Sequence, residues 1–387
     1  MTSEIDVGII GGGVIGLSCA WRLAQGGARV AVFERATVGR EASWAAAGML
    51  AAQCEAAHHP PLDPEDIEYS MLRRKQQAMF DLCLESRAMY GDFADELFAE
   101  TNLDIELSIA NHCRNDERTP GILYVQSAND DAAFSRFAQQ QERGLTVENA
   151  PDFNGFPSLW LPQEGQVNNR VLAQALLFAL RKLKVPIFEN EEVRCVQSRD
   201  LKRCEIVSSR RQMKCENVLL CGGARSSRHA QLPQNCAPPI KPVAGQMIAL
   251  RSPKIPRHII YGSDVYLVPR RDGRVLVGAT MENVGFDAQT SIAAAKQLFA
   301  NAARLIPDLE EDSIEDQWAG LRPQTPDGLP VLSRGEAEGF YVATGHFRNG
   351  ILLAPITAKL MADCILRNIE PPREFALQRF THETLRS

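Results

Sequence analysis

The sequence predicts an α/β protein with two domains, one built on a parallel sheet and the other on an antiparallel sheet with helices. Residues 5–34 alternate between strand, glycine loop, helix and strand. Residues 246–280 form short alternating stretches joined by Gly/Asp turns, which is typical of an antiparallel sheet. Residues 339–366 again run from strand through a glycine loop to helix. A chain of 387 residues is long enough for two domains.

The overall composition is that of a soluble globular protein, with 45% hydrophobic and 23% charged residues. A net charge of -6 without a long basic run predicts no nucleic-acid partner. No stretch of about 18 uninterrupted apolar residues occurs, so no membrane partner is expected. The acidic Glu4 and Asp6 argue against a signal peptide. Ten scattered cysteines without a C-x-x-C spacing predict no metal site and indicate a reduced, cytoplasmic protein.

The N-terminal segment carries the parts of a dinucleotide-binding unit. A short apolar run at 5–10 is typical of a buried parallel strand and leads directly into the glycine loop. In that loop Gly11 permits a tight turn, Gly13 lets the backbone approach a pyrophosphate, and Gly16 allows close packing of helix on strand. The helix N-terminus favours negative phosphates, and Glu34 can accept hydrogen bonds from ribose hydroxyls. The unit by itself suits FAD and NAD equally.

The middle of the chain supplies helices and the end of a further parallel strand. Small residues at 43–48 suit a wall against a large planar ligand, or simply the start of an alanine-rich helix. Helical spacing predicts one or two helices over 65–100 and another over 167–184, and 218–224 has the pattern of a buried strand ending in glycines. The polar segment 111–120 is expected to be a loop, either a flap or a surface insertion without a role.

The second half of the chain predicts a substrate domain and a second helix N-terminus. Alternating strands are expected at 246–250, 265–269 and 274–280, and such a block inserted into a dinucleotide fold suits a substrate domain. Near the C-terminus, a strand over 339–345 leads through a loop into a helix expected to begin at Ile351. The positive end of that helix would stabilise negative charge on a bound cofactor.

Six stretches of the chain together carry a family resemblance. They are residues 11–16, Ser43-x-Ala-Ala-Ala-Gly-Met-Leu, Tyr266-Leu-Val-Pro-Arg, Val277-Gly-Ala-Thr-Met, Trp318-Ala-Gly-Leu-Arg-Pro-x-Thr-x-Asp-Gly and Gly345-His-Phe-Arg-Asn-Gly-Ile-Leu-Leu-Ala-Pro. With these motifs in this order, nearly the whole chain resembles the D-amino-acid oxidase superfamily of flavoproteins, and most closely the glycine oxidases of thiamine biosynthesis.

The resemblance implies a Rossmann-like FAD-binding domain and an α+β substrate domain on an antiparallel sheet. The FAD-binding domain is expected to be discontinuous, from residues 1–85, 145–225 and 320–387. The substrate domain is expected from residues 86–144 and 226–319.

The resemblance also implies residues that contact the substrate. Arg322 is expected to grip a substrate carboxylate, a role for which a planar guanidinium fork is better suited than lysine; without its motif it would equally suit a structural ion pair. Tyr266 is expected to cap the carboxylate, with a core tyrosine as the alternative. Met281 matches an apolar wall over the substrate, and Arg348 matches a second residue near substrate and flavin.

Contacts to FAD carry over from the resemblance to residues throughout the chain. They are expected at Gly11, Gly13, Val14, Ile15, Gly16, Glu34, Arg35, Ala42, Ser43, Ala47, Gly48, Met49, Val193, His346, Phe347, Arg348, Asn349, Gly350, Ile351 and Leu352. Relatives with covalently bound flavin have a cysteine five residues before a matching Thr-Pro-Asp. Here Gly320 precedes Thr325 at that spacing, so FAD is expected to be non-covalent.

The implied reaction is oxidation of glycine or a similar small amino acid. The α-carbon hydride passes to flavin N5, and molecular oxygen then gives hydrogen peroxide. Asp264 departs from the histidine expected two residues before Tyr266, and this leaves the preferred substrate open. Sarcosine or D-amino-acid oxidation, a dehydrogenase with another electron acceptor, and a non-catalytic NAD-binding module are the alternatives. The oligomeric state, including a homo-oligomer, also stays open.

Overall fold

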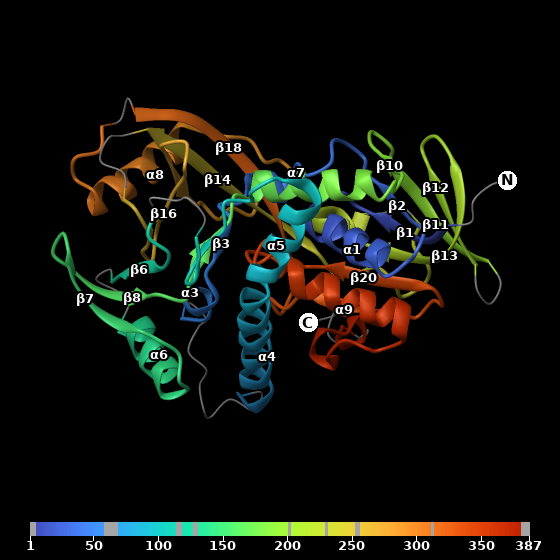
Figure 1. The fold of residues 1–387 in the computed structure, drawn as a ribbon, viewed down its shortest axis with the longest axis horizontal. Coiled ribbons are helices and arrows are strands. Elements are labelled where there is room, and N and C mark those ends of the chain that lie inside the picture. The colour runs from blue at the N-terminus through green and yellow to red at the C-terminus, as the bar shows by residue number, and fades with distance from the viewer. Residues whose placement is uncertain are drawn as a thin grey trace.

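The computed structural model describes residues 5–57, 69–113, 118–126, 131–199, 203–228, 231–251, 256–310 and 313–380. Two large sheets lie side by side along the long axis of the molecule (Figure 1). The sheet that contains the N-terminal strand lies at the right of that view, and we call it the dinucleotide sheet. The second sheet lies at the left, and we call it the antiparallel sheet.

The dinucleotide sheet is built around parallel strands. Its strands are β1 (Ile5–Ile10), β2 (Val30–Phe33), β10 (Ile187–Phe188), β11 (Val193–Arg199), β12 (Arg203–Ser208), β13 (Gln212–Leu220), β19 (Val331–Arg334) and β20 (Phe340–Thr344). β1 pairs in parallel with both β2 and β13, and β13 pairs in parallel with β20. Strands covered on both faces are uninterrupted apolar runs, which explains the apolar sequence of β1 and its burial.

The antiparallel sheet is formed by segments from distant parts of the chain. Its strands are β6 (Ile122–Val125), β7 (Glu148–Phe153), β8 (Phe156–Leu161), β14 (Lys241–Arg251), β15 (Ile259–Tyr261), β16 (Tyr266–Pro269), β17 (Arg274–Gly278) and β18 (Ile314–Gln324). The order β18-β14-β17-β16-β15-β6-β8-β7 is antiparallel apart from the parallel pair β15–β6. The strand expected at 246–250 is confirmed within β14, and those expected at 265–269 and 274–280 are confirmed as the slightly shorter β16 and β17.

Helices and one small sheet connect and cover these layers. The helices are α1 (Val14–Gln25), α2 (Ala42–Ala45), α3 (Ala52–Ala57), α4 (Tyr69–Ala88), α5 (Tyr90–Thr101), α6 (Asp131–Glu142), α7 (Asn169–Lys182), α8 (Ile292–Leu305) and α9 (Ala354–Arg367), with short 3₁₀ helices η2 (Gly223–Arg228), η4 (Arg373–Phe375) and η5 (Leu377–Arg379). The small sheet is formed by β3 (Met49–Leu50), β4 (Ser108–Ile109), β5 (His112–Cys113) and β9 (Gly165–Gln166).

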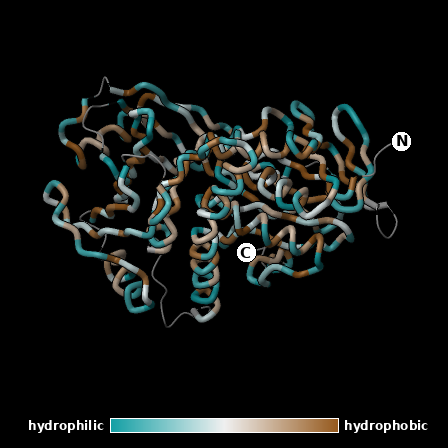
Figure 2. Tube along the Cα trace, in the orientation of Figure 1, coloured by the Kyte–Doolittle hydropathy of each residue, from teal (hydrophilic) through white to brown (hydrophobic). Residues whose placement is uncertain are grey.

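The largest hydrophobic core lies where α1 packs against α7 and α9. Leu17, Leu176 and Met361 are fully buried there, together with side chains of β1 and β2. Figure 2 shows hydrophobic stretches along the central strands and inner helices, and hydrophilic stretches along the outer loops. This packing holds the N-termini of α1 and α9 in fixed positions at one edge of the dinucleotide sheet.

The C-terminal helix begins later than its periodicity predicts. The sequence places its start at Ile351, whereas α9 begins at Ala354. The carbonyl groups of Ile351 and Leu352 accept hydrogen bonds from the side chains of Tyr90 and Ser86, so residues 351–353 form turns that extend the loop. The helices predicted within 65–100 and 167–184 are confirmed as α4, α5 and α7, although residues 65–68 lie outside the described chain.

Sheet membership and helix packing depart from the expected domain boundaries, most clearly at β7, β8 and α5. β7 and β8, inside the segment 145–225 assigned to the FAD-binding domain, pair with each other and with β6 in the antiparallel sheet. α5, assigned to the substrate domain, packs its buried Phe93 and Leu97 into the core around α1. Both differences arise from long-range packing, which the local pattern of β7, β8 and α5 does not encode.

The segment expected to be a loop at 111–120 begins as a hairpin. His112 and Cys113 form β5, paired with β4, and residues 114–117 lie outside the described chain.

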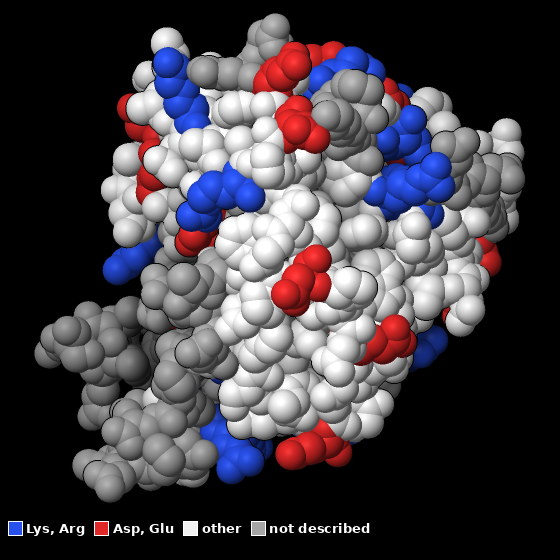
Figure 3. Space-filling view, turned by 90° about the vertical axis from the view of Figure 1, so that its left-hand side faces the viewer, with Lys and Arg blue, Asp and Glu red and all other residues white. Residues whose placement is uncertain are grey.

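Among the described residues, no helix has the length and apolarity needed to cross a bilayer. The face of the molecule that carries the left-hand end of Figure 1 is largely uncharged, with charges of both signs scattered over it (Figure 3).

Candidate active site

Two adjoining cavities run from the glycine loop to the antiparallel sheet. The glycine-loop cavity lies beside Gly11, Glu34 and Val193. The central cavity reaches Tyr266 and Arg322. Both cavities are lined by Gly13, Ala42, Ser43, Cys221, Gly223 and Leu321. The two therefore form one elongated site between the two large sheets.

Most residues expected to contact FAD line this site. Those on the wall of one or both cavities are Gly11, Gly13, Val14, Ile15, Glu34, Arg35, Ala42, Ser43, Ala47, Gly48, Met49, Val193, His346, Phe347, Arg348, Asn349, Gly350 and Ile351. Gly16 and Leu352 line neither cavity. Gly16 lies under the glycine loop, where an added Cβ would be 2.0 Å from the carbonyl oxygen of Gly11. Leu352 is buried in the main core, so its expected FAD contact has no counterpart among the lining side chains.

The glycine-loop end of the site is formed mainly by backbone. Gly11 has a φ of +112°, and an added Cβ would lie 2.3 Å from the carbonyl oxygen of Cys221. The N–H of Gly12 donates to Glu34 Oε2 at 2.8 Å, and the N–H of Val14 donates to Ser43 Oγ at 2.9 Å. Glu34 is thus held at the end of β2 and at the wall of the glycine-loop cavity.

The shape and chemistry of this end fit the dinucleotide part of FAD. An added Cβ at Gly13 would meet only Ser43 Oγ, at 3.2 Å, so the backbone here faces the open cavity. Gly13 is also the N-cap of α1, and its cap position has no side-chain partner. The positive end of a helix beside an open glycine backbone suits a pyrophosphate. Glu34, at the far end of the cavity, suits ribose hydroxyls.

The wall formed by residues 42–49 is tied to the antiparallel sheet by Arg270. This buried arginine follows β16 and donates to the carbonyl oxygens of Ala47 at 2.7 Å and Val167 at 3.1 Å. Burial lowers the pKa of Arg270 to about 9. Gly48 has a φ of +72°, and an added Cβ would lie 2.1 Å from the carbonyl oxygen of Val167. The backbone of this wall therefore has no room to move.

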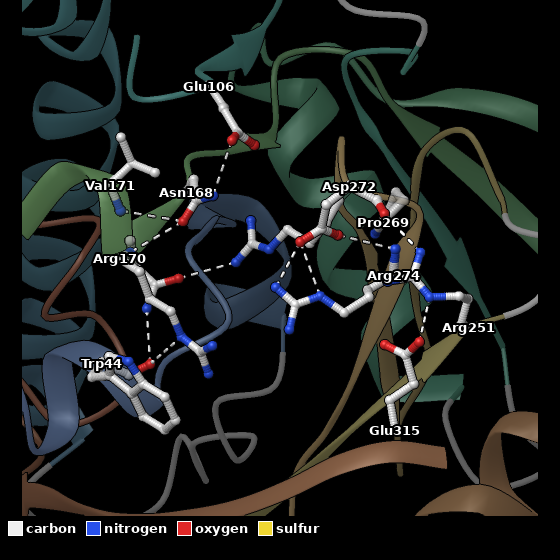
Figure 4. A network of polar contacts seen from close by, with 12 residues as sticks. Trp44, Glu106, Asn168, Arg170, Val171, Arg251, Pro269, Asp272, Arg274 and Glu315 are labelled. Carbon is white, nitrogen blue, oxygen red and sulfur yellow. Dashed lines mark hydrogen bonds and ion pairs between the residues drawn. The ribbon is translucent and has the colours of Figure 1, made fainter. Parts of the chain in front are cut away.

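A second set of contacts holds α2 from the other side (Figure 4). The guanidinium carbon of Arg170 lies 3.6 Å from the ring centre of Trp44, and its Nε donates to the Trp44 carbonyl at 3.4 Å. Asn168 caps α7 by accepting from the N–H groups of Arg170 and Val171, and its amide donates to Glu106 at 3.1 Å. The start of α7 thus fixes the segment that lines both cavities.

Arg322 lies at the other end of the site, on β18. Its Nη1 donates to the carbonyl oxygens of Thr280 at 3.0 Å and Ala244 at 3.4 Å. Among the described residues no carboxylate forms an ion pair with it, so the guanidinium keeps an unpaired charge. Burial lowers the pKa of Arg322, whereas Tyr266 acts in the opposite direction. The guanidinium lies over Gly245, where an added Cβ would come within 2.2 Å of Nη1.

Tyr266 lies over a second glycine of the same sheet. An added Cβ at Gly278 would come within 2.5 Å of the tyrosine ring. The ring is stacked against Tyr261, with centres 6.2 Å apart, and its hydroxyl donates to Met247 Sδ at 3.8 Å. Burial raises the pKa of Tyr266, which keeps the hydroxyl neutral. Arg322 and Tyr266 thus both line the central cavity, and their contact with a substrate carboxylate stays a prediction.

Arg348 also lines the central cavity, but it is not free. Its Nε and Nη2 donate to the two carboxylate oxygens of Glu55 at 2.9 and 2.8 Å, and Nη2 also donates to the hydroxyl of Tyr261 at 3.0 Å. The negative charge of Glu55 raises the pKa of Arg348. Arg322 and Arg348 therefore differ in kind, because only Arg322 can offer an unpaired charge to a ligand.

The loop between β20 and α9 forms the remaining wall. His346 is buried, and its Nε2 lies 3.0 Å from Thr357 Oγ1. Burial lowers the pKa of His346 to about 3, so the imidazole is neutral at physiological pH. Phe347 has a positive φ of 48°, which turns the chain back along the cavity.

Met281 and Asp264 lie farther out than the other expected residues. With Tyr266 and Arg348 they line an outer cavity that adjoins the central one. Met281 is 58% exposed. Asp264 is also exposed and forms an ion pair with Arg304 at 3.2 Å. Neither residue lines the central cavity, so an apolar wall at Met281 stays a prediction.

Three residues that shape the site have no role predicted from the sequence: Glu55, Gly245 and Arg270. Glu55 ends the small-residue stretch after Ser43 and looks like a surface acid until Arg348 is placed beside it. Gly245 is one of many glycines near a strand, and only the register of β14 with β18 places it under Arg322. Arg270 closes the Tyr266 motif, and this neighbourhood is the only local sign of its importance.

Comparisons with known proteins agree with this geometry. The family described as FAD dependent oxidoreductase matches residues 6–364. The bifunctional protein ThiO/ThiG of Synechocystis sp. is 34% identical over 396 residues, which cover 99% of this chain. The chain spans about half of that relative, 55% of its length.

Two further relatives match end to end. A glycine oxidase of Geobacillus kaustophilus is 32% identical over 385 residues, with 95% of this chain and 94% of that protein covered. The crystal structure of glycine oxidase from Geobacillus kaustophilus has a TM-score of 0.84 at 30% identity, with 98% of this chain and 99% of that chain covered. The family match includes both the glycine loop and Arg322, and the chain belongs to the FAD-dependent oxidoreductases of D-amino-acid oxidase type.

Proposed function

We propose that the protein is an FAD-dependent oxidase of glycine or a similarly small amino acid, and that its product serves synthesis of the thiamine thiazole. The similarity to glycine oxidases over nearly the whole chain supports this activity. The reaction converts glycine and oxygen to the imine of glyoxylate and hydrogen peroxide, and the imine is either handed on or hydrolysed by water to glyoxylate and ammonia. In keeping with the cysteine usage, we assign the enzyme to the cytoplasm.

The observation that carries the proposal is the unpaired guanidinium of Arg322 at the end of the central cavity. A half-buried cation without a carboxylate partner is costly unless a ligand supplies one. Its planar fork suits a carboxylate in a bidentate arrangement. A small amino acid held there by its carboxylate would have Tyr266 beside it and the wall formed by residues 47–49 opposite.

The chain's own residues bind and orient the substrate more than they transfer protons. Tyr266 has a raised pKa, His346 is neutral and bonded to Thr357, and Glu55 is paired with Arg348. No one of these is a ready base, so we propose that the substrate binds with a neutral amine. Fixing the α-carbon in a reactive position accounts for much of the rate. FAD, when bound, supplies the electron acceptor.

Non-covalent FAD is part of the proposal. Gly320 lines the central cavity where the resemblance would require a cysteine for attachment. An added Cβ at Gly320 would lie 2.5 Å from the Cβ of Ala45, so this position has no space for a thiol without movement of α2. The backbone of the glycine loop, Glu34 and the wall formed by residues 42–49 would hold the cofactor.

A substrate panel tests the proposal directly. The holoenzyme is supplied with glycine, sarcosine, D-alanine and a simple amine, and hydrogen peroxide is measured together with the carbonyl product. The expected result is the highest kcat/KM for glycine or another small amino acid, with peroxide equal to product. Preference for D-alanine or sarcosine would move the assignment to the neighbouring oxidases. Product without peroxide would indicate a dehydrogenase.

A further inference from the structure

The second arginine of the central cavity is held by a compact polar assembly. Arg348 donates two hydrogen bonds to Glu55, and Tyr261 both accepts from Arg348 and donates to Glu55, each at 3.0 Å. The side chains of Glu55 and Arg348 are 14% and 25% exposed. Paired charges joined by two hydrogen bonds, each bonded also to Tyr261 and with little solvent around them, are much harder to separate than a surface ion pair.

Each member of the assembly is itself fixed. Tyr261 is buried between Tyr124 and Tyr266, with ring centres 6.2 Å from each. Glu55 lies on α3, and the N–H of Gln53 in the same helix donates to the buried Glu164 at 3.1 Å. Arg348 therefore cannot easily turn toward a ligand.

The assembly lies where the outer and central cavities meet. Both cavities are lined by Glu55, Tyr266, Phe347, Arg348 and Asn349. Arg322 and Arg348 line the same central cavity, so a further group of a substrate held at Arg322 can reach this junction. A neutral group there lies beside an ion pair with no net charge. A second carboxylate would instead be repelled by the Glu55 carboxylate, and Arg348 could not bind it because its hydrogen bonds already go to Glu55.

We propose that Glu55 determines specificity: with Tyr261 it occupies and neutralises Arg348, so that the enzyme accepts amino acids with one carboxylate and rejects those with two. The proposal rests on the proposed function, in which Arg322 holds the first carboxylate. Selection here works by making the wrong ligand unfavourable rather than by adding a contact to the right one.

The test compares two ligands that differ by one carboxylate. Sarcosine and iminodiacetate share the secondary amine and the first carboxylate, and kcat/KM is measured for both on the holoenzyme. Acetate and malonate, which are not oxidised, are titrated in parallel, and their Kd values are read from the flavin absorbance. The ratio of the two Kd values reports the selectivity for one carboxylate even if neither amine is a good substrate.

Glu55→Gln keeps the size and one hydrogen bond but removes the charge, which frees Arg348 for a second carboxylate. The ratio of monocarboxylate to dicarboxylate, in kcat/KM and in Kd, should fall by about 10- to 100-fold, the worth of one charged hydrogen bond. Tyr261→Phe keeps the ring stack and loses only the bridging hydroxyl, so it should shift the ratio less in the same direction. It also serves as the second variant if Glu55→Gln folds poorly.

The matched control is Asp264→Asn, which removes one negative charge from the outer cavity without touching Arg348. It should leave the ratio unchanged. An unchanged ratio in Glu55→Gln, or an equal shift in Asp264→Asn, overturns the proposal. Failure of the proposed function would look different, because neither wild-type protein nor variants would oxidise any amino acid while the Kd comparison would still read out Glu55.

Discussion

The two ends of the elongated site differ in the groups that form their walls. At the glycine-loop end a large part of the wall is the backbone of one strand–loop–helix unit with Gly11 and Gly13, beside Glu34 and the segments 191–193 and 221–225. At the other end the wall is side chains, and Arg322, Tyr266 and Arg348 come from two strands and a loop far apart in sequence. The first end depends on local conformation, and the second depends on register between strands. Substitutions at the two ends should therefore fail in different ways.

The largest effect is expected at the backbone end. Gly13→Val would put a branched side chain into the open cavity, and the purified protein should contain almost no FAD. Its fold should survive, since an added Cβ meets only Ser43 Oγ at 3.2 Å. FAD content is measured by absorbance, with circular dichroism as the check on folding, and Gly13→Ala should give a milder loss. Full FAD content in Gly13→Val would contradict this assignment of the pyrophosphate site.

The same flavin measurement tests how FAD is attached. Acid precipitation of the wild-type holoenzyme should release FAD into the supernatant, because Gly320 offers no thiol. Yellow colour that stays in the protein pellet would show covalent attachment instead.

At the side-chain end, Arg322→Ala should leave FAD content near normal and damage catalysis. Loss of a charge-assisted pair costs on the order of 2–5 kcal/mol, or about 30- to several-thousand-fold in kcat/KM for glycine. A simple amine without a carboxylate should lose much less, and Arg322→Lys should be intermediate. Steady-state kinetics of both substrates decide the matter. Equal losses for glycine and the amine would make Arg322 a structural residue.

A smaller effect is expected when Arg322 is displaced rather than removed. In Gly245→Ala the new methyl group would lie within 2.2–2.5 Å of the guanidinium atoms, which must shift. A shift of about 1 Å can cost up to roughly 100-fold in rate, so a 10- to 100-fold loss toward glycine is expected. Gly91→Ala, where the nearest neighbouring atom is His112 Nδ1 at 3.7 Å, is the control. Unaltered kinetics in Gly245→Ala would mean that Arg322 does not need this position.

The smallest effect concerns stability and the neutral His346. Its pKa of about 3 lies below the ordinary value of 6.5, so between these values the unfolded chain binds a proton that the native protein does not. The neutral His346 therefore contributes to the free energy of unfolding. This contribution is complete above pH 6.5 and is lost as the pH falls, so the free energy of unfolding should decrease by on the order of 1–2 kcal/mol between pH 7 and 5. Denaturant unfolding with excess FAD should show a weaker pH dependence in His346→Gln. Equal slopes in the wild-type protein and His346→Gln would refute the assignment.

Local patterns account for much of the fold. The apolar run of β1, the glycines after it and the helical spacing of α1 predict their own structures, because each is decided by neighbours in sequence. The start of α9 is missed because Ser86 and Tyr90, from helices far away in the chain, bind the carbonyls of the preceding turn. The sequence places β7 and β8 in the FAD-binding domain, because α6 separates them in the chain from β6, the strand with which β8 pairs in the antiparallel sheet.

The sequence by itself determined the glycine loop with Glu34, and the motifs that point to Arg322 and Tyr266. These rest on backbone conformation or on residue types within short segments. Only the tertiary structure decided which of the two cavity arginines is free. Glu55 and Arg348 are 293 positions apart in the sequence, and no local pattern reveals that their charges cancel. Pairing between distant charges depends on where folding brings them, and that placement leaves Arg322 as the arginine able to receive a carboxylate.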